Sequence, residues 1–82
     1  MVPLSMTPTG AKVKVARIVA GSRLRSRLAH MGIYEGTIVE VIANVRRGPV
    51  IISRDEARYG LGFGMAKKIF VTYLSSPRQE RE

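Results

Sequence analysis

Apolar and polar residues alternate along much of this chain in a way that predicts β-strands. Four stretches either alternate or are almost continuously apolar: 12–20, 37–45, 50–53 and 69–74. The alternation in the first slips by one residue near Ala16 and Arg17, which predicts a β-bulge of the kind that bends a strand in a small barrel. The stretch 46–49 has turn residues, so we expect the strands on either side of it to pair as a hairpin.

The segment between the first two predicted strands has the spacing of a helix instead. Leu24, Leu28 and Met31 recur at i, i+4 and i+7, so they share one face. Because both faces of the strand at 37–45 are largely apolar, we expect the helix to cover part of its outer face. The other helix positions include Arg23, Arg25 and Arg27. These arginines form either a solvated face, whose long side chains cover apolar surface, or a docking face for an anionic partner.

Both ends of this helix carry local signals. Ser22 is a suitable N-cap, because its hydroxyl can accept a hydrogen bond from an unpaired amide of the first turn. Gly32 lies at the end of the predicted helix, where a glycine in the left-handed backbone conformation is common. Ile33 is then expected to fold back on Leu28 in a Schellman motif.

A glycine-rich stretch at 58–64 follows the predicted hairpin. Its apolar residues Tyr59, Leu61 and Phe63 alternate with Gly60, Gly62 and Gly64. A strand here therefore has one bare face, which accommodates either the bend of the barrel, the helix or a partner. The stretch does not match a phosphate-binding loop, since no Gly-Lys-Ser/Thr sequence follows. The residues 65–68 are typical of a single helical turn.

Length, charge and cysteine content narrow the class of protein. The 82 residues predict one domain, at 1–74, with a flexible polar tail at 75–82 and a lead-in anchored to the core by Leu4 and Met6. A net charge of +8 indicates an anionic partner, which is a nucleic acid, a membrane surface or an acidic protein. The absence of cysteine fits a reducing cytoplasm, and we find no export signal or membrane-spanning stretch.

Few side chains in this sequence are suited to catalysis or metal binding. His30 is the single histidine, and Asp55 and Glu56 lie in a charged turn beside Arg54 and Arg58. A solvated turn explains these carboxylates better than acid–base chemistry does. Without cysteine or a second histidine, the chain cannot assemble a dedicated transition-metal site. We therefore expect no enzyme activity, no resident metal and no cofactor.

One pattern of residues runs through nearly the whole chain, from residue 4 to residue 72. It consists of Leu28-x-x-Met31-Gly32-Ile33-x-x-Gly36-Thr37-x-Val39-x-Val41, then Gly48-Pro49-Val50, Leu61 and Ala66-x-x-Ile69-x-Val71. This pattern resembles the FeoA family. The resemblance implies a mainly β fold, a small SH3-like β-barrel of about five strands with a short helix inserted after the first strand.

The resemblance also implies a function. It points to a cytoplasmic accessory protein of ferrous iron uptake that binds the cytoplasmic part of the membrane transporter FeoB, with recruitment to the inner face of the membrane but no direct insertion. On this reading the candidate partner-binding residues are Arg23, Arg27, Leu28, Met31, Tyr34, Arg46 and Arg47. The edge strands of a small barrel have unpaired backbone groups, so a second copy of the chain is a further candidate partner, in a homo-oligomer. The alternative is a basic SH3-like barrel that binds RNA or another nucleic acid, whose affinity falls steeply with salt.

Overall fold

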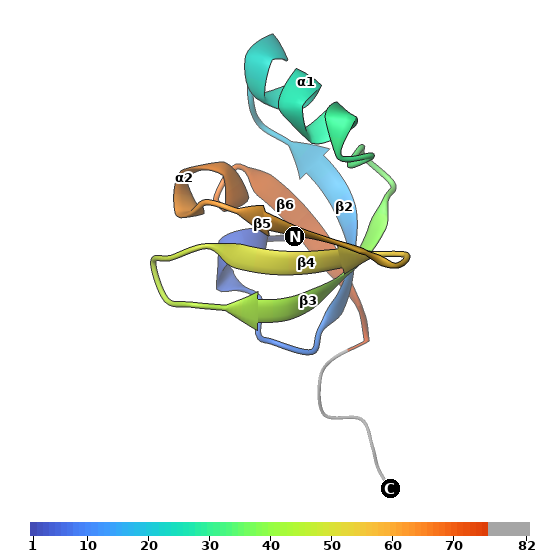
Figure 1. Cartoon of the computed structure of the whole chain (residues 1–82), viewed down its shortest axis with the longest axis vertical. Coiled ribbons are helices and arrows are strands. Elements are labelled where there is room, and N and C mark those ends of the chain that lie inside the picture. The colour runs from blue at the N-terminus through green and yellow to red at the C-terminus, as the bar shows by residue number, and fades with distance from the viewer. Residues whose placement is uncertain (76–82) are drawn as a thin grey trace, which may run out of the picture.

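The fold is described by a computed structural model, which places residues 1–75. Its strands are β1 (Val2–Pro3), β2 (Lys12–Ile18), β3 (Ile38–Asn44), β4 (Val50–Arg54), β5 (Ala57–Leu61) and β6 (Ile69–Ser75). Its helices are the 3-10 turn η1 (Leu4–Met6), α1 (Ser22–His30) and α2 (Phe63–Ala66). The six strands form one antiparallel sheet in the order β1-β6-β2-β3-β4-β5, with α1 inserted between β2 and β3 (Figure 1).

This architecture confirms the predicted mainly β fold, a small SH3-like barrel with a helix after its first long strand. The sheet has six strands instead of about five. The additional strand, β1, has two residues, Val2 and Pro3, which pair with Val71 and Phe70 of β6. A strand this short has no room for an alternating pattern, so the sequence gives no periodic signal for it.

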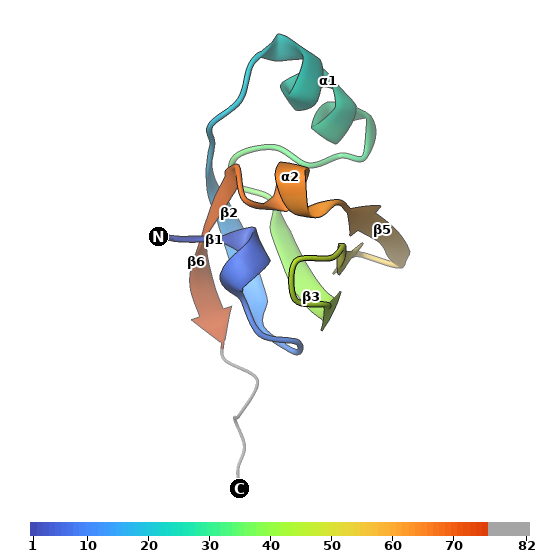
Figure 2. The same cartoon turned by 90° about the vertical axis from the view of Figure 1, so that its left-hand side faces the viewer.

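The core lies inside the curled sheet. Alternate residues of the long strands point into it: Val13, Val15, Val39, Val41, Val50, Ile52, Ile69 and Val71 are all buried. The helices and β5 contribute Leu4, Leu28, Leu61 and Ala66. Figure 2 shows η1 and α2 lying across the space between β6 and β5. Removing these apolar side chains from water is the main force that closes so small a barrel.

The predicted bulge in β2 is confirmed. The register between β2 and β6 shifts between Val15 and Arg17, so Ala16 is the extra residue. Val15 and Ile18 are consequently both buried, although their spacing is odd. The bend lets one strand pair with β3 at its start and with β6 along its length.

The hairpin of β3 and β4 is also confirmed, but the glycine-rich stretch differs from the prediction. β5 ends at Leu61, and Phe63 begins α2, which lies two residues earlier than the predicted turn at 65–68. The exposed Phe63 therefore does not share a face with Leu61. A Cβ added to Gly62 or Gly64 would meet nothing within 4 Å, so neither the bend of the barrel nor the helix packs closely against these two glycines in residues 1–75.

Two expectations about packing were wrong. Met6 does not anchor the lead-in, since it is 73% exposed, and Leu4 alone does so from η1. The helix α1 does not cover β3, because it lies at one end of the barrel (Figures 1 and 2) and leaves Ile38 exposed. The last strand, β6, ends at Ser75, one residue beyond the predicted domain boundary at 74. The rest of the predicted tail, 76–82, lies outside the described residues.

Within residues 1–75, none of the helices has the length and apolar character needed to cross a membrane.

Candidate functional site

The start of α1 differs from the prediction. Gly21 is the N-cap, in extended conformation, and no side chain caps the helix. Its carbonyl accepts the first helical hydrogen bond, from the amide of Arg25 at 3.1 Å. Ser22 is already inside the helix, so its hydroxyl is not placed to accept a bond from the amides that follow.

The end of α1 is a Schellman motif, as predicted. The amide of Ile33 donates to the carbonyl of Leu28 at 2.9 Å, and that of Gly32 donates to Ala29 at 2.9 Å. Gly32 has φ +75°. The Nε of Arg54, at the end of β4, also donates to the carbonyl of Met31 at 3.3 Å. The last turn of the helix is therefore fixed to the barrel.

A second attachment of α1 was not visible in the sequence. The Nη2 of Arg25 donates to the Oε2 of Glu35 at 3.2 Å and to the carbonyl of Ile18 at 3.0 Å. The same Oε2 accepts a hydrogen bond from the amide of Ile18 at 3.1 Å. The helix, the end of β2 and the turn before β3 thus meet at one carboxylate. Nothing in the sequence spacing signals this meeting, because only the tertiary fold brings the three segments together.

Glu35 is expected to titrate at low pH. The amide of Ile18 and, after it, the Arg25 guanidinium lower the pKa of this carboxyl below its usual 4.5. Because the folded pKa is depressed, the contribution of Glu35 to stability is present at neutral pH and is lost as pH falls through that pKa. An NMR titration of the Glu35 side chain measures it directly.

Two variants separate the causes of this shift. Arg25→Ala is expected to raise the pKa of Glu35, yet to leave it below 4.5, since the amide of Ile18 still donates. Arg23→Ala removes the same charge from the same helix and is expected to leave the Glu35 pKa unchanged. An equal shift in both variants would show that general charge on the helix, and not the hydrogen bonds, determines the pKa.

The helix α1 presents two different exposed sides. Arg23, Arg27 and His30 follow one another at i, i+4 and i+7, so they lie on one side, which we call the α1 basic face. All three are exposed. Within residues 1–75 neither arginine of this face forms a salt bridge, in contrast to Arg25.

The other side of α1 borders a shallow hollow of about 550 Å³, which we call the α1 hollow. Its lining is Ile18, Ser22, Arg25, Ser26, Ala29, Tyr34 and Glu35. The Tyr34 hydroxyl reaches the carbonyl of Ala29 at 3.4 Å, and its amide donates to the Thr37 hydroxyl at 2.9 Å. The hollow is open to solvent, and its lining combines polar and apolar side chains.

The seven predicted contact residues fall into separate groups. Leu28 is fully buried, so it holds α1 in place and offers no side chain to a partner, and Met31 is half-buried. Tyr34 belongs to the hollow and not to the basic face. Arg46 and Arg47 occupy the turn between β3 and β4, which lies well away from α1 with α2 between them (Figures 1 and 2). The structure thus separates two basic surfaces.

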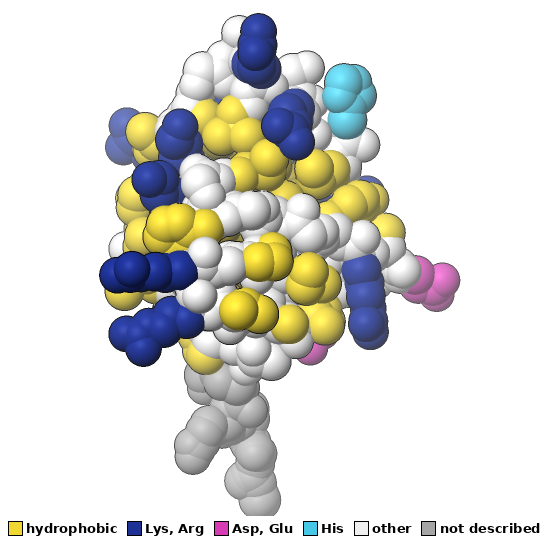
Figure 3. All heavy atoms as spheres, turned by 60° about the vertical axis from the view of Figure 1, so that its left-hand side comes forward, with side chains coloured by type: hydrophobic (Ala, Val, Ile, Leu, Met, Phe, Trp, Pro, Cys, Tyr) yellow, Lys and Arg dark blue, Asp and Glu magenta, His cyan; other side chains and the backbone are white. Residues whose placement is uncertain are grey.

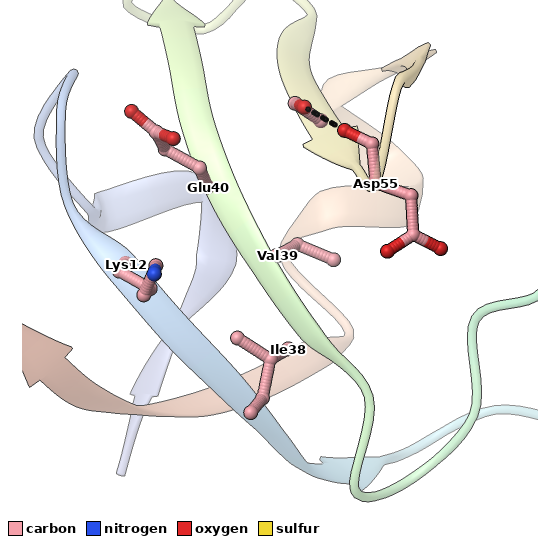
Figure 4. A pocket seen from close by; sticks show the side chains of 6 residues that line it. Lys12, Ile38, Val39, Glu40 and Asp55 are labelled. Carbon is pink, nitrogen blue, oxygen red and sulfur yellow. Dashed lines mark hydrogen bonds between the residues drawn. The ribbon is translucent and has the colours of Figure 1, made fainter.

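A second hollow, of about 280 Å³, lies over β2, β3 and the turn after β4 (Figure 4). Its lining is Lys12, Ile38, Val39, Glu40, Ser53 and Asp55. The carboxylates of Glu40 and Asp55 point away from each other, and the Ser53 hydroxyl lies 3.4 Å from the Asp55 backbone carbonyl. Nowhere in residues 1–75 do three or more His, Cys, Asp or Glu side chains gather as metal ligands would.

Comparison with known proteins identifies the family. The sequence model of the FeoA domain matches residues 2–73, which is nearly the whole described chain. The chain belongs to the FeoA family. It is 42% identical over 71 residues to a Methanocaldococcus jannaschii protein named "Putative Fe(2+) transport protein A", and the match covers 87% of this chain and 85% of that protein.

Solved structures agree with membership of the FeoA family. A crystal structure of an iron uptake regulatory protein (FeoA) superposes with a TM-score of 0.84 at 36% identity, covering 89% of this chain and 97% of that one. A manganese-dependent transcriptional repressor superposes with a TM-score of 0.83 at 28% identity, but only 41% of that chain is covered. The family match favours iron transport over the nucleic-acid alternative.

Proposed function

We propose that this FeoA-family protein is a non-enzymatic accessory protein of ferrous iron uptake, which works in the cytoplasm. It docks on the cytoplasmic part of a FeoB-type ferrous iron transporter and modulates that transporter. Membership of the FeoA family and the iron-transport name of the 42% identical relative support the process. The α1 basic face supports the mode of action, which is binding to an acidic surface of a protein.

The single observation that carries the docking proposal is the charge of the first turn of α1. The positive end of the helix dipole lies there and favours acidic residues, yet the first turn contains no acid and does contain Arg23. Arg23 and Arg27 are exposed and have no salt bridge within residues 1–75. The helix dipole accounts for Arg27, which lies in the last turn, but it does not account for Arg23, whereas an acidic partner accounts for both.

The contacts that fix α1 to the barrel also suit a helix that docks on a partner. Leu28 anchors the helix from below, Arg54 holds its last turn, and the Arg25–Glu35 pair ties its middle to the end of β2. A rigid helix loses little conformational entropy when it binds. The α1 basic face is therefore held ready for a partner without rearrangement.

Reversal of the charges on this face tests the proposal. Arg23→Glu with Arg27→Glu is expected to weaken binding to the isolated cytoplasmic domain of the transporter at least about tenfold, because like charges then meet across the interface. Isothermal titration calorimetry at physiological salt measures the affinity, which we expect to be in the range of about 1 μM for the unchanged protein.

The matched control is Arg46→Glu with Arg47→Glu. It makes the same change in net charge on exposed residues far from α1, so binding is expected to fall no more than about twofold through long-range electrostatics. Equal weakening by both double variants would mean that net charge and not the α1 basic face governs binding. Unchanged binding of the Arg23, Arg27 variant would remove this face from the interface.

A further inference from the structure

A second exposed surface, away from α1, combines apolar and basic side chains. It is built from η1, the β3–β4 turn, α2 and the two residues that follow α2, and we call it the η1–α2 face. Its apolar members are Met6, Val45 and Phe63, and its basic members are Arg46, Arg47, Lys67 and Lys68. The apolar side chains are 73%, 60% and 40% exposed. None of the seven lines either hollow described above.

Specific contacts bring the three segments of this face together. The side-chain amide of Asn44, at the end of β3, donates to the carbonyls of Ser5 at 3.1 Å and Thr7 at 2.6 Å. These bonds hold Met6 beside the β3–β4 turn. The pairing of Val50 with Leu61 places the start of α2 near the same turn, and α2 also packs against η1. Figure 2 looks onto the three neighbouring segments.

The charge on this face is positive. The acidic residues of the described chain are Glu35, Glu40, Asp55 and Glu56, and none belongs to η1, the β3–β4 turn or α2. Figure 3 views this side of the molecule, where basic side chains surround apolar ones and acidic side chains appear only at the margin. The Nζ of Lys67 lies 5.8 Å from the ring centre of Phe63, which joins an ammonium group to an exposed aromatic ring.

We propose that the η1–α2 face binds the surface of a bilayer that contains anionic phospholipids. Three apolar side chains project from three different short elements, which suits the disordered boundary between headgroups and acyl chains. The surrounding arginines and lysines match the negative surface charge of such a bilayer, and their long side chains let the charges stay at the headgroups. The binding is peripheral, so only the projecting side chains enter the boundary.

This assignment is independent of the docking proposal. The α1 basic face lies at another part of the molecule (Figures 1 and 2), so the chain can contact a transporter and the lipid beside it at once. Attachment to the bilayer restricts the search for a membrane-embedded partner and raises its effective concentration.

Vesicle binding tests the inference. Co-sedimentation of the full chain with vesicles of phosphatidylglycerol and phosphatidylcholine, at physiological salt, is expected to show binding that pure phosphatidylcholine vesicles do not give. Arg46→Glu with Arg47→Glu is expected to weaken this binding by about 30-fold or more, since two near-surface charges are lost and reversed. Met6→Ser with Val45→Ser is expected to weaken it about tenfold, because apolar contact with the boundary is lost.

The control is Arg23→Glu with Arg27→Glu, which changes net charge equally at the α1 basic face. It is expected to keep vesicle binding within about threefold of the unchanged protein. All the substituted side chains are exposed, and circular dichroism checks that each variant is folded. Equal losses from the two charge reversals would overturn the inference, because general charge would then explain binding. Failure to bind phosphatidylglycerol vesicles would also overturn it, and would point to an acidic protein as the occupant.

Discussion

Leu28→Ala is expected to lower the free energy of unfolding by about 3 kcal/mol. Leu28 is fully buried and is the only residue of α1 that is. Truncation removes apolar contacts and leaves a cavity where the helix meets the barrel, and the fixed backbone around it limits collapse. A loss of this size is a large part of the stability of a small domain. Urea unfolding followed by circular dichroism measures it.

A neighbouring substitution serves as the control. Arg27→Ala lies on the same helix, is exposed, and introduces a residue that favours helices. It is expected to change the free energy of unfolding by less than about 0.5 kcal/mol. If Leu28→Ala were as mild as this control, the packing of Leu28 would not be what holds α1 on the barrel, and its other contacts, such as those of Leu24 and Met31, would hold it.

Gly32→Ala is expected to lower the free energy of unfolding by about 1–2 kcal/mol, the cost of placing an L side chain in the left-handed region. Gly32 has φ +75°, and an added Cβ would lie 2.5 Å from the Nη2 of Arg54. The guanidinium can move aside, but it then gives up its bond to the Met31 carbonyl. Thermal and urea unfolding of the variant measure the combined effect.

Two comparisons separate these contributions. Gly62→Ala introduces the same side chain at an extended residue with nothing within 4 Å, and is expected to alter stability by less than about 0.5 kcal/mol. In the Arg54→Ala background, Gly32→Ala is expected to cost less than in the unchanged protein, because the two residues then no longer compete for space. Strict additivity would mean that Arg54 plays no part in the requirement for glycine.

The features that the sequence predicted well depend on local patterns. The long strands, the bulge at Ala16 and the hairpin of β3 and β4 follow from the alternation of apolar residues and the turn residues between them. The Schellman end of α1 follows from a glycine one position after the last helical turn and an apolar residue beyond it. Each of these signals lies within a few residues of the structure it specifies.

The features that the sequence did not predict depend on how separate elements pack against one another. Met6 has the apolar character of an anchor, but Leu4 takes the one inward position of η1. The alternation through Phe63 continues past the true end of β5, since a period of two cannot show where a strand gives way to a turn. The link between Arg25 and Glu35 has no sequence signal, because it needs the end of β2 beside the helix.

The candidate site was predicted only in part, because the sequence does not show how the elements are arranged in space. The sequence identified the basic residues, but not which of them share a surface. The structure keeps Arg23 and Arg27 together on α1 and places Arg46 and Arg47 on the η1–α2 face. The predicted contact residues therefore belong to two surfaces, and substitutions can test the binding of each surface independently.

The most direct test of the docking proposal is an amide NMR titration of the labelled chain with the cytoplasmic domain of the transporter, at physiological salt and without lipid. The proposal predicts saturable shifts that concentrate on residues 22–34, which comprise α1 and the turn after it, and that leave the β3–β4 turn unaffected. Shifts confined to other elements, or no shifts at a saturating concentration, would contradict the assignment of α1 as the docking element.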